Sequence, residues 1–458
     1  MTTVEQIAAF TLRVRDEDLS NVHRERLKCH VLDTLGCAVG ALSAAPVRQI
    51  RGVIDEFGGR ELCTMIGGGK TSPDRAALFN GALVRYLDFM DNFVAKDEVC
   101  HPADNFGALL VAAEYAGRSG QELLTALAVA YQVQCRLIEA LPTMRAGINY
   151  TTPLAFSIAA GAARLLGLNE TQTAHALALA GVDGISLAVI QAEPVSQWKG
   201  LASADVNAHA LQCVFLARAG ITGPLGVFDG PVGLYDLVKH KASIDWSKEG
   251  LDVIERCALK KFNAEFQSQA VLEAIMLLRQ EHGDLRVEDI EEVTVDVPRG
   301  AYEVIGGGDY GPKTECHVKE QADHNLPYLV AVALLDGEVW PEQFAAERIN
   351  RADVQALLRK VTVHPKMTYS WSIPKELPAR VAISRREGKT LHGEVTDYPG
   401  FHTRPMGWEQ VRAKFDRLTE PFADTGLRAR VVETAANLET CKTAELLSLL
   451  AQTGRSMA

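Results

Sequence analysis

Hydrophobic residues recur at helical spacing from the N-terminus to about residue 265. Leu27, Val31 and Leu35 lie on one face of such a pattern, and Pro153–Leu166 is rich in alanine, which allows helices to approach closely. Gly167 follows directly and supplies a stop signal for the helix. Repeated along this part of the chain, the pattern predicts an all-helical domain of roughly ten helices.

The period of the pattern changes near residue 290. Val293, Val295 and Val297 alternate with polar residues, as in a half-buried strand. Three later runs share this short apolar character: Val361–Val363, Val381–Ile383 and Leu391–Val395. Between the first and second runs lie two helical stretches, Leu326–Leu335 and Val354–Leu358. We expect a small α+β domain with an antiparallel sheet and helices against one face.

Helical periodicity returns after Gly400. It is seen in three stretches: Glu409–Leu418, Leu427–Leu438 and Ala444–Leu450. The pattern therefore predicts a mostly-α fold with a large all-helical domain built from both chain ends, residues 1–265 and 400–458. Residues 266–399 form a smaller inserted α+β lid domain in this interpretation. The C-terminal helices are expected to pack on the N-terminal ones.

Composition and charge narrow the class of protein. The 458 residues are 47% hydrophobic and 23% charged, which is typical of a soluble globular protein and excludes a disordered or collagen-like chain. Lys and Arg number 47 against 58 Asp and Glu, a net charge of −11 without any basic run. Nucleic acid, whose phosphates attract basic surfaces, is not an expected partner.

The nine cysteines include no CxxC pair and no Cys/His cluster at metal-ligand spacing. They predict reduced thiols in a cytoplasmic protein, without a zinc or iron–sulfur site. The N-terminus lacks a basic region followed by a long apolar stretch, and the most apolar segment, Leu326–Leu335, is about half a membrane span. We therefore expect a cytoplasmic chain with no membrane partner.

Two short motifs, one containing glycines and one containing a serine, give only weak evidence for nucleotide binding and for hydrolase chemistry. Gly306, Gly308 and Gly311 satisfy GxGxxG, but Pro312 follows at once and no βαβ context surrounds them, which favours a flexible loop. Ser186 half-matches a nucleophile elbow, yet an alanine-rich helix is predicted before it where a strand is needed. The sequence therefore predicts neither a nucleotide cofactor nor hydrolase chemistry.

One stretch combines two carboxylates with an imidazole. Asp88 and Asp91 are three residues apart, so they share a helix face if the helix continues, and His101-Pro102 opens the next predicted helix. Such a group can transfer protons, because a positioned carboxylate or His can take a proton and a neighbouring group can deliver one. The alternative is a solvated acidic helix end. Asp97, in the adjacent loop, is expected to be nearly silent when replaced by Asn.

Three further stretches could bind an anion. Lys199 lies between Trp and Gly in a small apolar stretch, and Lys260 is followed by a second lysine and by amide side chains such as Gln267. His324 stands at a predicted helix start. The alternatives are a surface lysine, a solvated lysine pair and a helix-capping residue. Each stretch alone is weak evidence for a site. Only the fold could bring these three stretches and the Asp88–His101 stretch together.

These stretches also carry a resemblance that covers nearly the whole chain. Its motifs are LDFMD…HPADN, QWKG, LKKFNAEFQSQ, ADHNLPYLVAVALLDG and RPMGWEQVRAKF. Together they resemble the MmgE/PrpD family, whose best-known members are 2-methylcitrate dehydratases. The HPADN form is similar to that branch, whereas the cis-aconitate decarboxylase branch more often reads HPSG.

The resemblance implies a fold, a chemistry and a set of residues. It implies a helical domain from both chain ends, a lid, a site between them, a homodimer, and acid–base catalysis on a small polycarboxylate without metal or cofactor. Asp91 and His101 match the family's active-site Asp and His, and Lys199 and Lys260 match its two lysines; these four are the expected catalytic residues. The expected substrate-binding residues are Asp88, Asn105, Gln267 and His324.

The resulting hypothesis is a hydro-lyase that dehydrates a 2-hydroxy tricarboxylate such as 2-methylcitrate or citrate. The reaction needs a base, an acid and cations, because the C–H bond is weakly acidic and hydroxide is a poor leaving group. At Gln267 the dehydratase branch tends to carry His. A decarboxylase, an epimerase or isomerase on a related polycarboxylate, a non-catalytic family member and a hydrolase built on Ser186 are the alternatives.

Overall fold

Local capping signals fix where the helices begin and end. Ser119 and Glu122 form a capping box at the start of α6 (Gly120–Ala140), since each side chain bonds the other residue's backbone N–H. Gly167, at φ 72°, ends α7 (Thr151–Leu166) in the left-handed conformation that glycine adopts without strain, as predicted. The computed structural model describes residues 1–96, 98–283, 285–386 and 388–454.

Helices make up most of the described chain, so the predicted mostly-α class is confirmed. Besides α6 and α7, the N-terminal part contains α1 (Thr3–Arg13), α2 (Asn21–Gly40), α3 (Ala45–Phe57), α4 (Pro73–Tyr86), α5 (Phe106–Tyr115), α8 (Glu170–Asp183), α9 (Ala202–Arg218) and α10 (Leu234–Val238). The middle part contains α11 (Gln269–His282), α12 (Arg299–Ala301), α13 (Lys319–Ala322), α14 (Leu326–Asp336), α15 (Ala346–Ile349), α16 (Ala352–Leu358) and α17 (Met367–Ser372). The last helices are α18 (Trp408–Thr419), α19 (Thr425–Ala436) and α20 (Thr443–Leu450).

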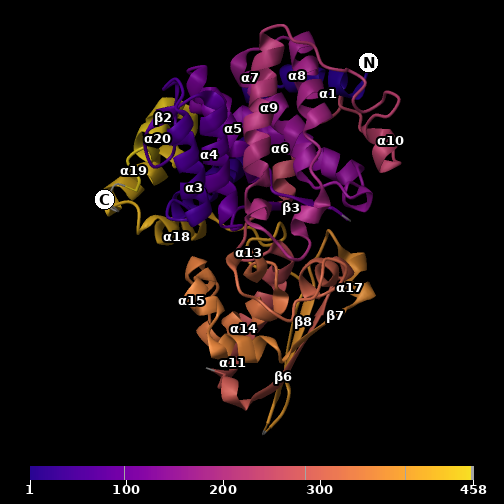
Figure 1. Ribbon diagram of the computed structural model, residues 1–458, viewed down its shortest axis with the longest axis vertical. Coiled ribbons are helices and arrows are strands. Elements are labelled where there is room, and N and C mark those ends of the chain that lie inside the picture. Colours follow the sequence, from indigo (N-terminus) through magenta and orange to yellow (C-terminus); the bar gives the residue numbers. More distant parts are fainter. Residues whose placement is uncertain (97, 284, 387, 455–458) are drawn as a thin grey trace.

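Two large hydrophobic cores divide the described part of the molecule. The larger contains residues from Val4 to Leu259 and again from Val411 to Leu450, while the smaller runs mainly from Ala258 to Phe401. Figure 1 shows the corresponding large helical body and a smaller body around α11, α14 and the sheet. Among the C-terminal helices, α18 and α19 contact α2, and α20 contacts α5. The domain limits at residues 265/266 and 399/400 stay a prediction.

The C-terminal helices pack closely on the N-terminal ones. A β-carbon at Gly36 in α2 would lie 3.2 Å from the Cα of Phe415 in α18, so only a very small residue allows this approach. Phe415 itself is 2% exposed. The chain therefore returns to its first helices after it has formed the smaller body.

The smaller body contains a four-stranded sheet in the order β7-β6-β8-β9, whose strands are β6 (Ile290–Val297), β7 (Val361–Pro365), β8 (Ala379–Arg385) and β9 (Leu391–Val395). Helices α11 and α14 contact its strands from one side, as expected. The expectation of a fully antiparallel sheet is wrong for β7, which pairs parallel with β6. More than sixty residues, including several helices, separate these strands, and such a crossover permits parallel pairing.

Five short strands that were not predicted lie in the larger body: β1 (Cys63–Thr64), β2 (Lys70–Thr71), β3 (Asn92–Val94), β4 (Val99–Cys100) and β5 (Cys257–Ala258). Strand β3 pairs with both β4 and β5. These pairs bring the segment around Asp88 and His101 next to the one around Lys260. Two stretches far apart in the sequence thereby meet at the junction of the two bodies.

No single helix among the described residues is long and apolar enough to span a membrane. Helices α2 and α3 pass such a test only when taken together, and they are bent by 81° at the break between them.

The packing of α18 gives a stability prediction. Phe415→Ala removes a buried ring between α18 and α2, and such a change costs about 3–5 kcal/mol of unfolding free energy. We expect a clearly lower midpoint in thermal and urea unfolding followed by circular dichroism. Phe57→Ala is the matched control, because Phe57 is 66% exposed and its loss should cost less than about 0.5 kcal/mol. Equal midpoints for the two variants would contradict the packing of the returning chain.

Candidate active site

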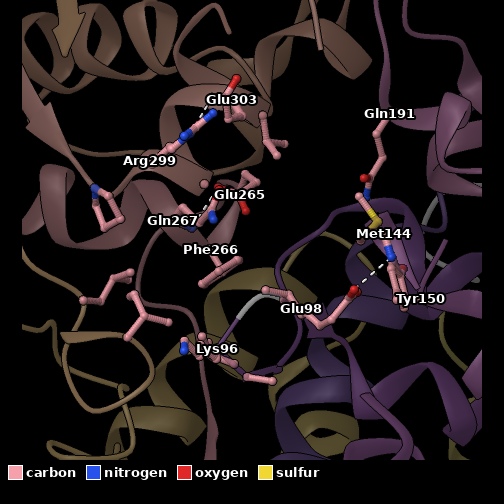
Figure 2. Close-up of a pocket in the computed structure, with 18 of the residues that line it drawn as sticks. Lys96, Glu98, Met144, Tyr150, Gln191, Glu265, Phe266, Gln267, Arg299 and Glu303 are labelled. Atoms are coloured by element: carbon pink, nitrogen blue, oxygen red, sulfur yellow. Dashed lines mark hydrogen bonds and ion pairs between the residues drawn. The ribbon is translucent and has the colours of Figure 1, made fainter. Parts of the chain in front are cut away.

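A cavity of about 750 Å³ lies between the two bodies. Figure 2 shows side chains from both sides of it: Met144 and Tyr150 belong to the larger body, and Glu265, Gln267 and Arg299 approach from the opposite wall. The lining residues with polar or charged side chains include Arg85, Asp88, Lys96, Glu98, His101, Arg145, Tyr150, Gln191, Glu265, Gln267, Arg299, Glu303 and His324.

Asp88 stands at a break in the backbone. Helix α4 ends at Tyr86, and Asp88 adopts φ 56°, a left-handed conformation that is strained for a residue with a β-carbon. The expectation that Asp88 and Asp91 share a helix face is therefore wrong, because the helix does not continue. The turn directs both the carbonyl and the carboxylate of Asp88 toward Lys260.

Two buried cations hold the Asp88 carboxylate. The Nζ of Lys260 donates to the Asp88 carbonyl at 2.7 Å and to Oδ1 at 2.8 Å, and Nη1 of Arg85 donates to Oδ1 at 2.6 Å. Burial alone would raise the pKa of Asp88, but the charges of Arg85 and Lys260 outweigh it and hold this pKa well below its usual range. Asp88 is therefore an anion at neutral pH.

Lys260 is positioned in turn by Lys414 of α18. The Nζ of Lys414 donates to the carbonyls of Phe89 at 2.7 Å and Lys260 at 3.0 Å, and it pairs with Asp33 Oδ1 at 2.7 Å. Lys260 is fully buried. Residues from both chain ends thus support the same two segments.

His101 presents one nitrogen to the cavity. Its Nδ1 lies 2.7 Å from the carbonyl of Asp91, and because a carbonyl can only accept, Nδ1 carries the proton. Burial is the largest cause that lowers the pKa of His101, and the positive charges of Arg85 and Lys260 lower it further, so this pKa lies well below 6.5. The ring is neutral at pH 7, and Nε2, 4.0 Å from Asp88 Oδ1, has a free lone pair.

The carboxylate of Asp91 faces the protein interior. Its Oδ2 accepts from His30 Nδ1 at 2.8 Å and from the Tyr131 hydroxyl at 2.7 Å, and its Oδ1 accepts from the Ala103 N–H at 2.8 Å. Asp91 is 0% exposed. It contacts His101 through its backbone carbonyl, so it orients the imidazole from behind.

A second imidazole faces the same cavity. His324 donates from Nδ1 to Asp323 Oδ1 at 2.9 Å, and burial lowers its pKa to about 4. Asp323 also binds Lys199 through Oδ1 and Lys319 through Oδ2, the latter at 2.8 Å. Burial lowers the pKa of Lys199 to about 8, and the charge of Asp323 opposes that shift.

Glu265 and Gln267 approach from the smaller body. Glu265 Oε2 accepts from the Gln267 N–H at 2.7 Å, and burial raises the pKa of Glu265 to about 8. A carboxyl group with this pKa is mostly protonated at neutral pH. Gln267 Oε1 is buried and has no hydrogen-bond partner among the described residues, so it can accept a hydrogen bond from a ligand.

The structure divides the eight residues expected from the sequence into three groups. Four of them line the cavity: Asp88, His101, Gln267 and His324. Three lie behind the described lining residues and bind them or their neighbours: Asp91, Lys199 and Lys260. Asn105 is more remote, since its amide bonds the Pro102 carbonyl, Gln134 and Ser157. The roles assigned to all eight stay predictions.

Sequence reasoning missed several members of the site. Arg85 lies three residues before Asp88, a spacing that pairs opposite charges, and this signal was available. Glu265 belongs to the LKKFNAEFQSQ motif, but nothing in the sequence singles it out, because its burial cannot be seen there. Tyr150, which accepts from Arg85 at 3.0 Å and donates to Asp104 at 3.1 Å, gave no signal. Asp97 lies outside the described residues.

One group of possible metal ligands exists among the described residues. Donor atoms of Asp88, Asp323 and His324 all lie within 4.8 Å of one another. Three of the four carboxylate oxygens already bind cations, however: Lys260 and Arg85 bind Asp88 Oδ1, and two lysines bind the oxygens of Asp323, while Asp88 Oδ2 has no hydrogen-bond partner among the described residues. A divalent ion would have to displace these charges, so the group fits a metal poorly.

Ser186 lies apart from this site. It follows α8, a helix rather than a strand, and its N–H donates to Thr152 Oγ1 at 3.0 Å. The lining residues that the structure describes do not include it. This geometry does not favour a hydrolase built on Ser186.

Comparison with known proteins gives consistent matches along the chain. The MmgE/PrpD N-terminal domain matches residues 5–247, and the MmgE/PrpD C-terminal domain matches residues 262–440. The chain is 27% identical to 2-methylcitrate dehydratase of Escherichia coli K12 (82% of this chain, 81% of the relative) and 27% identical to that of Cupriavidus necator (92% and 91%). It is also 27% identical to an alkylcitrate dehydratase of a fungal species (94% and 90%). With domain matches that together span most of its length, the chain belongs to the MmgE/PrpD family, as its motifs indicated.

Proposed function

We propose that the chain is a carbon–oxygen lyase that removes water from a 2-hydroxy tricarboxylate of the citrate type. One observation carries the proposal: a neutral imidazole, His101, and a protonated carboxyl group, Glu265, line one cavity. Such a pair can accept one proton and deliver another within a single site. The dehydratases among its relatives support the same reaction class.

The proposed steps balance as follows. His101 Nε2 takes the proton from the carbon next to a carboxylate, and the C–H electron pair forms the new double bond. The C–O bond breaks, and Glu265 protonates the departing hydroxyl to give water. His101 is left as an imidazolium 4.0 Å from Asp88, whose negative charge stabilises it. Proton exchange with solvent then restores both groups.

The charges around the cavity favour a polyanion. Among the described side chains at the base of the site, four cations face the carboxylates of Asp88 and Asp323: Arg85, Lys199 and Lys260 are buried, and Lys319 is partly buried. Lys96 and Arg145 add positive groups to the lining, whereas the charge of Arg299 is balanced by Glu303 at 3.1 Å. In a chain of net charge −11, this concentration of cations attracts a trianion to one place. Lys199 and Lys260 would act mainly through this field and through the carboxylates that they hold.

Other features of the expected enzyme stay predictions: the homodimer, the cytoplasmic location and the preference for 2-methylcitrate or citrate. A decarboxylase or epimerase would use a similar pocket, and product analysis separates the three reactions. Water loss gives a new double bond without release of carbon dioxide.

The proposed acid, Glu265, predicts how the activity depends on pH. Glu265 is protonated below its pKa of about 8, so activity should be high at neutral pH and fall as the pH rises through that value. His101, with its lowered pKa, stays unprotonated over the same range. Glu265→Gln should lower kcat by about 10²–10⁴-fold and remove the alkaline limb from the pH profile, measured by absorbance of the double bond. Glu303→Gln, a change in a lining carboxylate paired with Arg299, is the control and should keep both. Wild-type kcat in Glu265→Gln would exclude the acid.

Asp91 should act as a positioning residue that also contributes to the stability of the fold. In Asp91→Asn, an NH₂ group must face either the Ala103 N–H or the donors from His30 and Tyr131. We expect turnover to fall about a hundredfold and the unfolding free energy to fall by about 2 kcal/mol. The exposed Asp205→Asn is the control and should change neither. Unchanged turnover in a correctly folded Asp91→Asn variant would contradict this role.

Metal-free catalysis can be tested directly. The buried lysines and Arg85 already neutralise the carboxylates of the candidate donor group found among the described residues, so dialysis against a chelator should leave kcat unchanged. A known zinc enzyme treated in parallel checks that the chelation is effective. Loss of activity that a divalent ion restores would overturn this part of the proposal.

A further inference from the structure

The ion pair between Arg85 and Asp88 uses only half of the hydrogen-bonding groups that such a pair can use. Nη1 of Arg85 donates to Asp88 Oδ1 at 2.6 Å. An arginine and a carboxylate frequently pair through two parallel hydrogen bonds, which engage two guanidinium nitrogens and both carboxylate oxygens. Here Arg85 Nη2 and Asp88 Oδ2 have no hydrogen-bond partner among the described residues. Each member of the pair therefore keeps one hydrogen-bonding group for a ligand.

Both of these groups belong to side chains that line the cavity, although Arg85 and Asp88 are each only 2% exposed. Asp88 Oδ2 is a buried anionic oxygen, and burial of such an atom is unfavourable until a donor binds it. Nδ1 of His324 lies 3.7 Å from it but donates to Asp323 instead. Arg85 Nη2 is not one of the buried atoms without a partner, so it meets the cavity surface. The pair can accept one hydrogen bond through Oδ2 and donate another through Nη2.

The plane of the Arg85 guanidinium group is fixed by Tyr150, which lines the same cavity (Figure 2). Nε of Arg85 donates to the Tyr150 hydroxyl oxygen at 3.0 Å. Tyr150 donates its own proton to Asp104 Oδ2 at 3.1 Å, so the lone pairs of its oxygen remain for Arg85. Because Nε and Nη1 are both bound, the planar group cannot rotate, and Nη2 keeps one direction.

The pair lies next to the proposed base. The rings of Tyr150 and His101 are in contact at an angle of 79°, with centroids 5.3 Å apart, and His101 Nε2 lies 4.0 Å from Asp88 Oδ1. A carbon whose hydroxyl group is bound by Asp88 and whose carboxylate is bound by Arg85 therefore places its neighbouring carbon beside Nε2. That neighbour is the carbon that loses a proton in the proposed dehydration.

We propose that Arg85 is a specificity-determining residue, which recognises the 2-hydroxy carboxylate group of the substrate together with Asp88. Arg85 Nη2 donates to the carboxylate on the hydroxyl-bearing carbon, and Asp88 Oδ2 accepts the hydroxyl proton. Tyr150 is a positioning residue that holds the guanidinium plane. The inference rests on the proposed function, because it assigns these contacts to the substrate of that reaction. It goes further because it distinguishes direct contact with one carboxylate from the attraction of a whole trianion by charge.

Four ligands separate the two contacts. Citrate carries both the hydroxyl group and the central carboxylate, tricarballylate lacks the hydroxyl, 3-hydroxyglutarate lacks the central carboxylate, and glutarate lacks both. Their dissociation constants are measured by calorimetry on the full-length Glu265→Gln variant, in which turnover during the titration is expected to be slow. Citrate should bind more than about tenfold tighter than tricarballylate, which has the same charge, because a hydrogen bond to a charged group contributes at least this factor.

Arg85→Lys, introduced into the same protein, tests the contact with the carboxylate. Lysine keeps the positive charge, but its single ammonium group cannot reproduce the fork that binds Asp88, Tyr150 and a ligand together. The preference for citrate over 3-hydroxyglutarate should fall at least about fivefold, while the affinity for glutarate should change by less than about twofold. Arg359→Lys, an exposed position outside the described cavity lining, is the matched control and should change no ratio.

Tyr150→Phe tests the positioning role. Loss of the oxygen that binds Arg85 Nε should weaken citrate and tricarballylate, which carry the central carboxylate, at least about threefold. Binding of 3-hydroxyglutarate and glutarate should not change. A merely structural role would weaken all four ligands alike or lower only the unfolding midpoint. Tyr115→Phe, in which the replaced ring is 38% exposed and lies outside the described lining, is the control.

The outcomes distinguish this inference from the proposed function, because dehydration of citrate and 2-methylcitrate is measured separately on the wild-type protein. Equal weakening of all four ligands by Arg85→Lys, or equal affinities for citrate and tricarballylate before that change, overturns the inference even if both substrates are dehydrated. The expected ratios without any dehydration support the recognition and overturn the proposed function. Absence of both overturns both. If Arg85→Lys does not fold, Tyr150→Phe and the ligand series decide the inference.

Discussion

The buried ion pair between Asp88 and Lys260 is the constraint on which the rest of the site depends. Both side chains are almost completely buried, and removal of one partner of such a pair leaves an uncompensated charge that costs about 3–5 kcal/mol. The pair also holds the left-handed backbone of Asp88, because Lys260 binds its carbonyl as well as its carboxylate. The end of α4 and the segment that leads into the smaller body are therefore fixed together, and the two walls of the cavity take their places from this point.

The C-terminal part of the chain, which packs on the first helices, stabilises the same junction between Asp88 and Lys260. Lys414 reaches the site from α18 and binds one carbonyl in each of the two segments that the ion pair joins, those of Phe89 and Lys260. Asp33 of α2 balances its charge. An inserted domain could rotate about its two connections, whereas here α18 binds the first connection through the buried charge of Lys414. The contacts that join the returning chain to the two bodies are therefore also the contacts that fix the geometry of the site.

The sequence predicted the parts of this structure that depend on local periodicity. The helix that ends at Gly167 and the strand containing Val293, Val295 and Val297 follow from spacing, since each buries one face. The direction of β7 did not follow, because pairing across a long crossover is decided by tertiary packing. At the site, His101 could be chosen from its neighbours, but its tautomer depends on a carbonyl that only the fold places. The acidity of Glu265 depends on burial, which no spacing reveals.

Burial acts in opposite directions on the two groups proposed to transfer protons. It raises the pKa of Glu265 and lowers that of His101, so both are neutral when the substrate arrives. The positive charges near Asp88 add to the effect on His101 and oppose the effect on Glu265, which places the acid near 8 rather than higher. A neutral acid has a second consequence: an ionised Glu265 would repel a tricarboxylate, whereas the protonated group leaves the surplus of buried cations free to attract it. The desolvation that prepares the acid for catalysis therefore also removes a negative charge that would oppose binding.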